Sequence, residues 1–335
     1  MGLGKRLIAT DAAGGPFVNT DNFSPVIYTG NCGTQSISSL SFAPDFVWVK
    51  GRTIDTSHNV FDSVRGATNY LASDLTSAEV AVSNALTSFD SNGWTMGSNP
   101  GMNFSSKTYV GWCWKAGGSA VSNTNGTITS TVSANVDAGF SIGIYNGNSS
   151  AGATIAHGLT AAPELLIVKS RNTIGGSSKA WTVYAAPLGN TKYFYLNANS
   201  QAQTYNFWNN TDPTTSVFSV SSDSNVNGTG GEYVFYAFHS VAGYQKIGTY
   251  VANTSGQDIT GLGFNPRFVL IKNITGSAAW RIFDSVRGDY KALYANLTNT
   301  EDTSTGYVSF ITDGFRLNGA DSNYGGNTFL YWAIA

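Results

Sequence analysis

The stretch Phe42–Lys50 reads FAPDFVWVK, and its pattern occurs three times in the chain. Ala162–Lys169 reads APELLIVK, and Phe264–Lys272 reads FNPRFVLIK. Each copy has a proline, one polar residue, four apolar residues and a lysine in the same order. Because internal repetition is the sequence signature of repeated structural units, this block predicts three homologous units.

Two further blocks keep the same order, one of them in two units and the other in all three. Phe61–Gly66 reads FDSVRG and returns unchanged as Phe283–Gly288. An aromatic stretch closes each unit, at Tyr109–Trp114, Tyr233–Phe238 and Phe329–Ala333. Because the blocks recur in one order, a chance match of short motifs does not explain them. The units are therefore expected to share one fold.

The apolar runs are typical of β-strands. They are short, rich in Val, Ile, Phe, Tyr and Trp, and bounded by Gly, Asn, Ser and Pro. Ser91–Gly93 and Asp313–Gly314 predict hairpins, and only Ser73–Leu86 has a composition that allows a helical turn or two. We therefore expect an all-β protein of three tandem antiparallel β-sandwich modules, lectin-like or jelly-roll-like in topology.

The repeats also set the expected domain boundaries. Residues 1–24 have few large apolar residues and are predicted to be an N-terminal arm. Modules are expected at 25–118, 138–242 and 243–335. Residues 119–137 are rich in Ser, Thr and Asn and are predicted to be a linker, with an edge strand as the alternative.

The composition limits the classes of partner that the protein could bind. Charged residues make up 11% of the 335 residues, and the net charge is -2. So few and scattered charges exclude the basic stripe of a nucleic-acid-binding protein. No apolar run has the length of a membrane span, which argues against insertion into a membrane. Cys32 and Cys113 are too few for a disulfide framework, so free thiols in a reducing cytoplasm are expected.

Two Asp/Arg pairs are the first candidates for chemistry. Asp62 with Arg65, and Asp284 with Arg287, could be an acid beside an anion clamp. The alternative is a structural turn in which the carboxylate accepts backbone N–H groups and an Arg, and recurrence within one scaffold favours it. The three histidines lie at non-equivalent places and no nucleophile has a recognisable setting, so neither a catalytic residue nor a cofactor is expected.

A calcium loop is a second candidate. Asp223, Asn225 and Asn227 match the first half of an EF-hand loop, with Gly228 at the turn position. The twelfth position is Val234, where a bidentate Glu is needed. A polar loop without an ion is therefore the favoured interpretation, with metal binding as the alternative.

A dense aromatic cluster suggests carbohydrate binding. Tyr193, Tyr195, Gln203, Tyr205 and Trp208 lie close together in the middle unit. Aromatic faces flanked by amides suit neutral sugars, because the ring stacks on C–H groups while amides bond hydroxyls. Strand alternation should bury about half of such residues, so core packing is the competing interpretation.

The repeated blocks, together with Tyr109–Gly118 (YVGWCWKAGG), resemble tandem β-modules in virion proteins of tailed bacteriophages. Such proteins are common in marine and cyanobacterial phages, where they are called tail fibre or structural proteins. The resemblance carries no catalytic residues. The middle unit departs from it, because Tyr184–Gly189 (YAAPLG) stands where the other two units have FDSVRG.

The resemblance implies an exterior structural protein of a virion, made in the host cytoplasm, and not an enzyme. Tail-fibre or tail-associated host adhesion through weak multivalent contacts is the first expectation, with host-surface glycan as its ligand. A capsid decoration or head-fibre protein is the alternative, and a glycan-degrading tailspike is remote because no carboxylate pair has the spacing it needs. The implied partners are other virion proteins, bound through the N-terminal arm, and further copies of the chain in a homotrimer.

Overall fold

The computed structural model describes residues 21–304, 307–318 and 325–335. Strands form 43% of it and helices 3%. Within the described residues the helical elements are α1 (Pro100–Asn103) and the short 3-10 turn η2 (Ala186–Leu188). The all-β prediction is confirmed, and Ser73–Leu86 is not helical.

The first unit comprises β1 to β9. Its main antiparallel sheet has the order β1 (Phe23–Thr29), β9 (Thr108–Trp114), β3 (Phe46–Gly51) and β4 (Asn59–Asp62). A small sheet facing it contains β2 (Gln35–Ile37), β8 (Gly93–Met96) and β7 (Leu86–Asp90). The short strands β5 (Asn69–Tyr70) and β6 (Val80–Ala81) pair with each other.

The second unit comprises β10 to β19. Its main sheet has the order β10 (Val121–Asn123), β11 (Ser130–Asn135), β12 (Phe140–Asn146), β19 (Glu232–Phe238), β14 (Leu165–Ser170), β15 (Thr182–Ala185), β16 (Lys192–Tyr195) and β17 (Gln203–Thr204). A pair of strands faces this sheet, β13 (Ala153–Ala156) and β18 (Val217–Val220).

The third unit comprises β20 to β27. Its main sheet has the order β20 (Gln245–Val251), β27 (Thr328–Ile334), β22 (Phe268–Asn273), β23 (Arg281–Asp284) and β24 (Leu293–Tyr294). Its small sheet contains β21 (Gln257–Thr260), β26 (Gly314–Leu317) and β25 (Val308–Ile311). The orders β1-β9-β3-β4, β12-β19-β14-β15 and β20-β27-β22-β23 are therefore the same.

The repeated apolar block forms the central strands β3, β14 and β22, and all four apolar residues are buried in each. Alternate residues of β3 enter different cores. Phe46 and Trp48 join a cluster shared by all three units, whereas Val47 and Val49 face the small sheet of their own unit. A strand buried on both faces needs an uninterrupted apolar run, which accounts for the pattern of the block.

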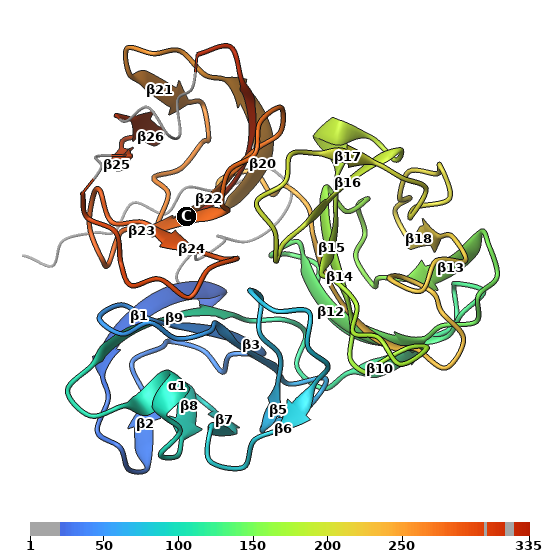
Figure 1. Cartoon of the computed structure of the whole chain (residues 1–335), viewed down its shortest axis with the longest axis horizontal. Coiled ribbons are helices and arrows are strands. Elements are labelled where there is room, and N and C mark those ends of the chain that lie inside the picture. The colour runs from blue at the N-terminus through green and yellow to red at the C-terminus, as the bar shows by residue number, and fades with distance from the viewer. Residues whose placement is uncertain (1–20, 305–306, 319–324) are drawn as a thin grey trace, which may run out of the picture.

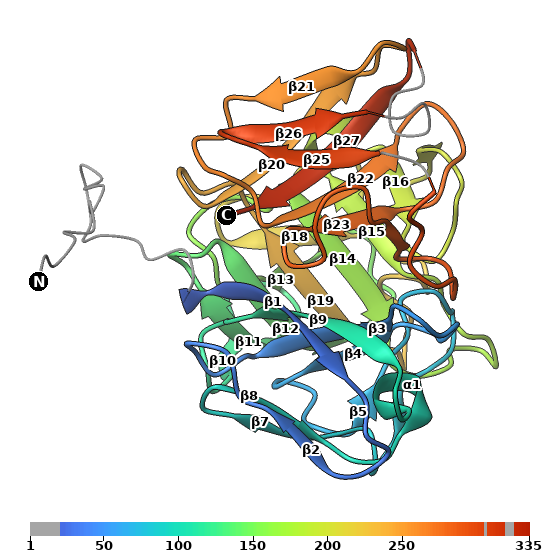
Figure 2. The ribbon, with the colours of Figure 1, turned by 90° about the vertical axis from the view of Figure 1, so that its left-hand side faces the viewer.

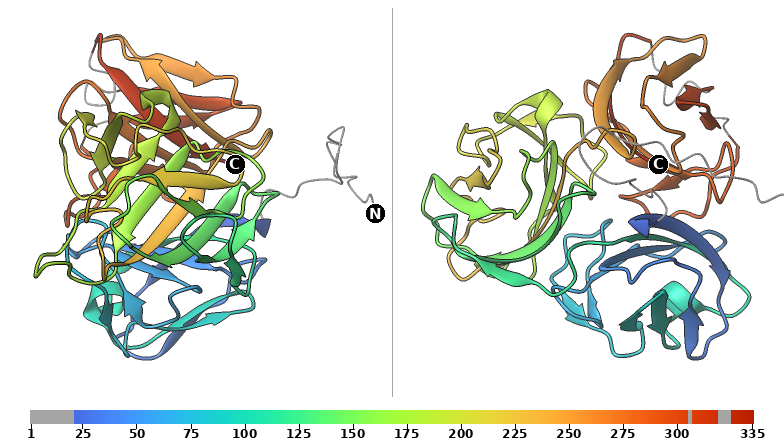
Figure 3. Two further views of the ribbon diagram at one scale, coloured as in Figure 1. Left: turned by 90° about the vertical axis from the view of Figure 1, so that its right-hand side faces the viewer. Right: turned by 180° about the vertical axis from the view of Figure 1, so that it is seen from behind.

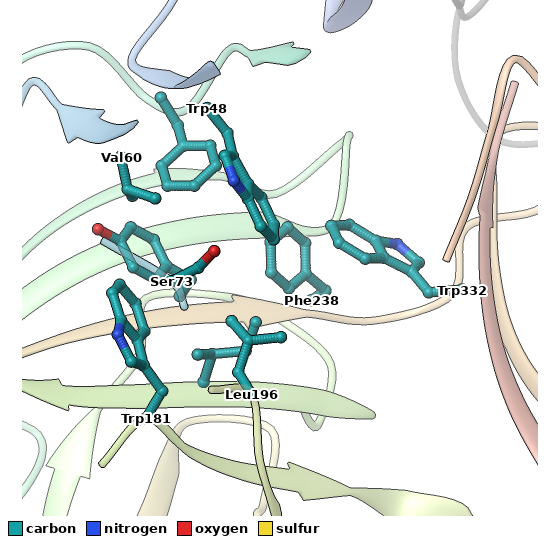
Figure 4. Close-up of a pocket in the computed structure, with 10 residues that line it drawn as sticks. Trp48, Val60, Ser73, Trp181, Leu196, Phe238 and Trp332 are labelled. Atoms are coloured by element: carbon teal, nitrogen blue, oxygen red, sulfur yellow. The ribbon is translucent and has the colours of Figure 1, made fainter. Parts of the chain in front are cut away.

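The three units surround a common centre and do not extend in a line (Figure 1, Figure 2, Figure 3). The main sheet of each unit contributes side chains to the shared cluster. Trp48, Trp181 and Trp332, one from each unit, line an apolar cavity of about 10 Å³ at this centre (Figure 4). That volume is about the least that holds one water molecule, so the cavity is a packing gap and not a ligand site.

The lysine that ends each block lies at the contact between units. Lys50, Lys169 and Lys272 are fully buried. Each donates to a backbone carbonyl of another unit: Lys50 to Thr298, Lys169 to Thr76 and Lys272 to Asn199, at 3.0, 3.2 and 3.0 Å. The first unit thus contacts the third, the second the first, and the third the second, which closes the ring.

An indole or imidazole N–H makes a second hydrogen bond between each pair of units. Trp181 donates to the Ala72 carbonyl at 2.8 Å, and Trp280 donates to the Tyr195 carbonyl at 3.0 Å. His58 takes this place in the first unit, where its Nε2 lies 2.7 Å from the Tyr294 carbonyl. Burial lowers the pKa of His58 to about 3, so the ring is neutral. Because its Nδ1 accepts from Trp48 Nε1, Nε2 carries the proton.

The FDSVRG block is a buried turn at two of the three contacts. Asp62 accepts from the backbone N and the Nε of Arg65, and Asp284 accepts in the same way from Arg287. Each aspartate also accepts a hydrogen bond from an aromatic side chain of another unit. Asp62 accepts from the Tyr236 hydroxyl at 2.7 Å, and Asp284 accepts from Trp112 Nε1 at 2.8 Å. The turn therefore stabilises its own loop and joins neighbouring units.

Glutamates extend these two contacts into charged networks. Glu79 binds Arg65 of its own unit at 2.8 Å and Arg171 of the second unit at 2.7 Å. Glu301 binds Arg287 of its own unit at 3.2 Å and Arg52 of the first unit at 2.9 Å. The surrounding arginines lower the pKa of both glutamates, although burial opposes this, so both carboxylates are ionised at neutral pH.

At the third contact, between the second and third units, apolar residues occupy the positions that these charged residues have at the other two contacts. The backbone bond from Glu79 to Arg171 corresponds to one from Ala202 to Ile274. Ala185 and Leu188 stand at the positions of the turn aspartate and arginine. Without an aspartate to reach, Trp332 Nε1 donates to Gln245 of its own unit at 2.9 Å. The departure of the YAAPLG block is therefore matched by apolar residues on both sides of this contact.

Two predicted boundaries differ from the structure. Residues 119–137, predicted to be a linker, contain β10 and β11, which extend the second main sheet beyond β12. A Ser- and Thr-rich composition suits a solvated edge strand as well as a linker, so composition alone could not separate the two. The predicted arm ends earlier than residue 24, because β1 begins at the buried Phe23; residues 1–20 lie outside the described residues.

The two predicted hairpins are confirmed. β7 turns into β8 through Ser91–Gly93, and β25 turns into β26 through Asp313–Gly314. A Cβ on Gly93 would lie 1.6 Å from the Ile37 carbonyl oxygen, and one on Gly314 would lie 2.0 Å from that of Ile259. Glycine is required at both places because the neighbouring strand passes this close.

Replacing Asp284 with Ala should destabilise the whole ring. The change leaves Arg287 buried beside Glu301 alone and deprives Trp112 of its acceptor, at a cost of about 3–5 kcal/mol. Urea denaturation measures the loss. Asp258→Ala, which breaks an exposed pair with Arg316, is the control and should leave the urea midpoint nearly unchanged. Equal midpoint shifts in the two variants would contradict the buried network.

Stability should rise with pH between 7 and 9. Burial lowers the pKa of Lys169 and Lys272 to about 7 and that of Lys50 to about 8, from 10.5 in the unfolded chain. In this window the unfolded chain binds more protons than the folded one, so the free energy of unfolding increases with pH. Urea titrations at several pH values test this, and Lys272→Met should reduce the slope. A flat or falling profile would count against it.

Candidate carbohydrate-binding site

The aromatic cluster of the second unit lies at the outer edge of its main sheet, on β16 and β17. These two strands pair so that Tyr193 lies opposite Gln203. The Tyr193 hydroxyl donates to Gln203 Oε1 at 2.7 Å. Tyr205 follows β17 directly, and its backbone N–H bonds the Thr191 carbonyl. Strand pairing thus brings Tyr193, Gln203 and Tyr205 together.

The rings of this cluster pack against one another. The Tyr193 ring lies 4.9 Å from that of Tyr195 and 4.6 Å from that of Phe207, both edge to face. Tyr205 lies 4.6 Å from Phe207. Phe207 is buried beneath them, whereas Tyr205 is 49% exposed. The cluster therefore has a buried floor and one ring open to solvent.

Trp208 belongs to the core and not to this surface. It is 1% exposed, its Nε1 donates to the Lys192 carbonyl at 3.2 Å, and its ring packs on Tyr184 at 5.7 Å. The prediction that Trp208 contacts a sugar is therefore wrong. The chain turns at residues 207–210, which directs both Phe207 and Trp208 inward, and neighbours in sequence need not alternate in a turn.

The candidate calcium residues do not converge on one point. Asp223 Oδ1 accepts from the backbone N and the Nδ2 of Asn225, at 2.7 and 2.9 Å. Asn227 is fully buried; its Oδ1 accepts from Asn148 N and its Nδ2 donates to the carbonyls of Ser150 and Ser221. Across the described ranges no group of three or more His, Cys, Asp or Glu could hold a metal ion.

Asp223 instead joins the aromatic cluster. Its Oδ2 accepts from the Tyr205 hydroxyl at 3.0 Å. This hydrogen bond raises the pKa of Tyr205, and burial raises the pKa of Tyr195, so both phenols stay protonated at neutral pH. The sequence does not indicate this contact, because 18 residues separate the two side chains and no local pattern links them.

We call the surface formed by Tyr195, Gln203, Tyr205 and Asp223, together with the Tyr193 ring that packs against it, the aromatic ledge. Tyr193 is only 8% exposed, so the prediction that it contacts a sugar directly is wrong and it supports the ledge from the core. It offers one exposed ring for stacking, together with phenol, amide and carboxylate groups for hydrogen bonds. This combination suits the apolar face and the hydroxyl groups of a neutral sugar. Because a ledge buries only part of a ligand, contacts at a single ledge should be weak.

The two Asp/Arg pairs offer no site for a substrate. The side chains of Asp62, Arg65, Asp284 and Arg287 are fully buried. Their oxygens and nitrogens already bond one another, neighbouring rings and backbone carbonyls. Both cysteines are free thiols, as predicted, with Cys32 exposed and Cys113 buried.

One family model matches residues 18–335, and its description is Domain of unknown function (DUF7483). A single model thus covers all three units, in agreement with the core that they share. No curated protein and no solved structure matches the chain. In the part of the chain that the structure describes, no helix is long and apolar enough to cross a membrane.

The ledge and the core beneath it should respond differently to truncation. Trp208→Ala removes a fully packed side chain and should cost about 3–5 kcal/mol. Tyr205→Ala removes an exposed ring and should leave the thermal midpoint within the error of the wild-type value. Thermal denaturation of both variants measures this. A large loss in Tyr205→Ala would mean that its ring has a structural role.

Proposed function

The chain belongs to this family of unknown function, and we propose that it is a non-enzymatic exterior structural protein of a tailed-phage virion that adheres to host-surface glycans. The observation that carries the adhesion proposal is the aromatic ledge, where the half-exposed Tyr205 is oriented by Asp223. The resemblance of the repeated blocks to phage virion modules supports the virion part.

The ledge favours neutral glycans. Its exposed ring can stack on the C–H face of a sugar, while Gln203 and Asp223 lie within reach of the hydroxyls beside that face. Holding Tyr205 through its hydroxyl reduces the rotamer entropy that binding would otherwise remove. Phosphorylated or sulfated glycans are disfavoured because the one charged ledge residue is a carboxylate.

A structural role without catalysis is supported by the burial of the two Asp/Arg pairs. Their bonds lie within the ring and join its units, so a substrate could reach them only if the units separated. A glycan-degrading tailspike, the remote alternative, would need two carboxylates facing an open cleft.

Multivalency is expected to come from many chains on one particle. The ledge residues lie in one unit, so one chain offers one ledge, and its weak contact adds up through effective concentration on the virion. A homotrimer remains our prediction for the assembled state. The N-terminal arm is the proposed attachment to other virion proteins.

Tyr205→Ala should reduce binding to host cells and to neutral glycans at least tenfold. Glycan arrays and cell pull-down with the whole chain measure this. The matched control is Tyr290→Ala, which removes a tyrosine of the third unit that is 43% exposed and lies outside the ledge. Equal losses in the two variants, or none in Tyr205→Ala, would refute adhesion through the ledge.

Antibody labelling of intact virions tests the location. Labelling at the tail supports host adhesion. Labelling on the capsid favours the alternative of a decoration or head-fibre protein, and absence from purified particles would refute the virion proposal altogether.

A further inference from the structure

The first unit contains a hollow of about 190 Å³, separate from the aromatic ledge. It lies beside β4, β5 and α1, and its lining consists of Ser57, Asn59, Tyr70, Val82, Ala85, Asn99 and Gly101. Tyr70 precedes Leu71, which bridges to Val60 of β4, just as Tyr193 precedes Phe194, which pairs with Val183 of β15. The hollow thus contains the tyrosine equivalent to Tyr193 of the ledge.

The lining is neutral and has both polar and apolar parts. Two amides, a hydroxyl and a phenol provide polar groups, and Val82 and Ala85 provide apolar surface. The pKa of Tyr70 is raised to about 12, chiefly by burial and next by the Asp74 charge, although a hydrogen bond with Ser57 opposes both. The phenol is therefore protonated at neutral pH, and no lining residue attracts an ion.

Asn59 and Asn99 are each fixed by hydrogen bonds through one part of the side-chain amide, and the remaining part of each can bond a ligand. Asn59 uses both hydrogens of Nδ2 to bond the carbonyls of Ser57 and Gly101, each at 3.1 Å, which leaves Oδ1 as an acceptor. Asn99 uses Oδ1 to accept from Gly101 N at 2.8 Å, which leaves its NH₂ group as a donor. An acceptor and a donor fixed by the backbone at Gly101 suit vicinal hydroxyl groups, since each hydroxyl both donates and accepts.

The volume limits the size of the ligand. Sites for drug-sized molecules begin at about 300 Å³, so this hollow suits something smaller, of the size of one sugar ring. Apolar side chains beside amide, hydroxyl and phenol groups can contact both the C–H groups and the hydroxyls of such a ring.

We propose that the hollow of the first unit is a second binding site, which takes a single neutral monosaccharide residue, such as the terminal residue of a glycan. The choice of a sugar over another small neutral polyol rests on the proposed function. The position of the site rests on the lining residues alone.

Saturation-transfer NMR with the whole chain tests this. The probes are glucose, galactose, mannose and N-acetylglucosamine, each at millimolar concentration. Each probe is measured with the wild-type chain and with Tyr205→Ala, which removes the exposed ring of the ledge. The further variants are made in the Tyr205→Ala background. At least one probe should bind, and Asn99→Asp should weaken that binding at least tenfold, because it replaces the amide donor with an acceptor while preserving the bond to Gly101 N.

Asn84→Asp is the matched control, since it makes the same change on an exposed residue that does not line the hollow. Gly101→Ala is a second variant. Its Cβ would lie 2.9 Å from Asn99 Oδ1 and 3.3 Å from Asn59 Oδ1, so it should also abolish binding. Thermal midpoints close to that of the parent would show that these variants remain folded.

The outcomes separate the two sites. Binding that is lost in Asn99→Asp and Gly101→Ala but kept in Asn84→Asp supports the second site. Binding by the wild-type chain that disappears with Tyr205→Ala would leave the ledge as the site and overturn this inference alone. Binding in the background that Asn99→Asp and Gly101→Ala do not change would also overturn it, as would no binding of any probe to that background.

Discussion

Burial of both faces of the three main sheets is the constraint on which the rest of the structure depends. One face of each sheet packs on the small sheet of its own unit, and the other packs on side chains from the remaining units. A single unit would expose the second face, including Trp112 and Trp332, to water. The apolar blocks and the buried lysines lie on central strands that are covered on both faces. Closing the units into a ring provides the second cover.

The three contacts between units show two solutions to one packing problem. At two of them, Asp, Arg and Glu form a buried network in which each charge has partners. At the third, Ala185, Leu188, Ala202 and Ile274 occupy the corresponding places. Losing only one charged member would leave the others buried and unpaired, at a high free-energy cost. Replacing the whole set with apolar residues avoids that cost, which explains why the differences occur together.

The side chains of the proposed sites belong to the cores of single units and to the surface, and not to the cluster that all three units share. The ledge uses β16 and β17 of the second unit, and the hollow uses the equivalent region beside β4 and β5 of the first. Core positions tolerate little change because protein interiors are close-packed and a change of even one methylene group affects the neighbouring side chains. Side chains that point away from this core are less restricted, so a rigid ring can present different surfaces for recognition.

The sequence by itself determined the all-β class, the three repeats and the two glycine hairpins, because strand alternation, turn chemistry and residue order are local properties. It also grouped Tyr193, Gln203 and Tyr205, since they are close in the sequence, and the pairing of β16 with β17 then brings them into contact. The tertiary structure alone decided that the units close into a ring, that Trp208 is core, that Asp223 serves Tyr205, and that residues 119–137 form strands. Those outcomes depend on which buried faces meet across long sequence separations, and no local pattern specifies that choice.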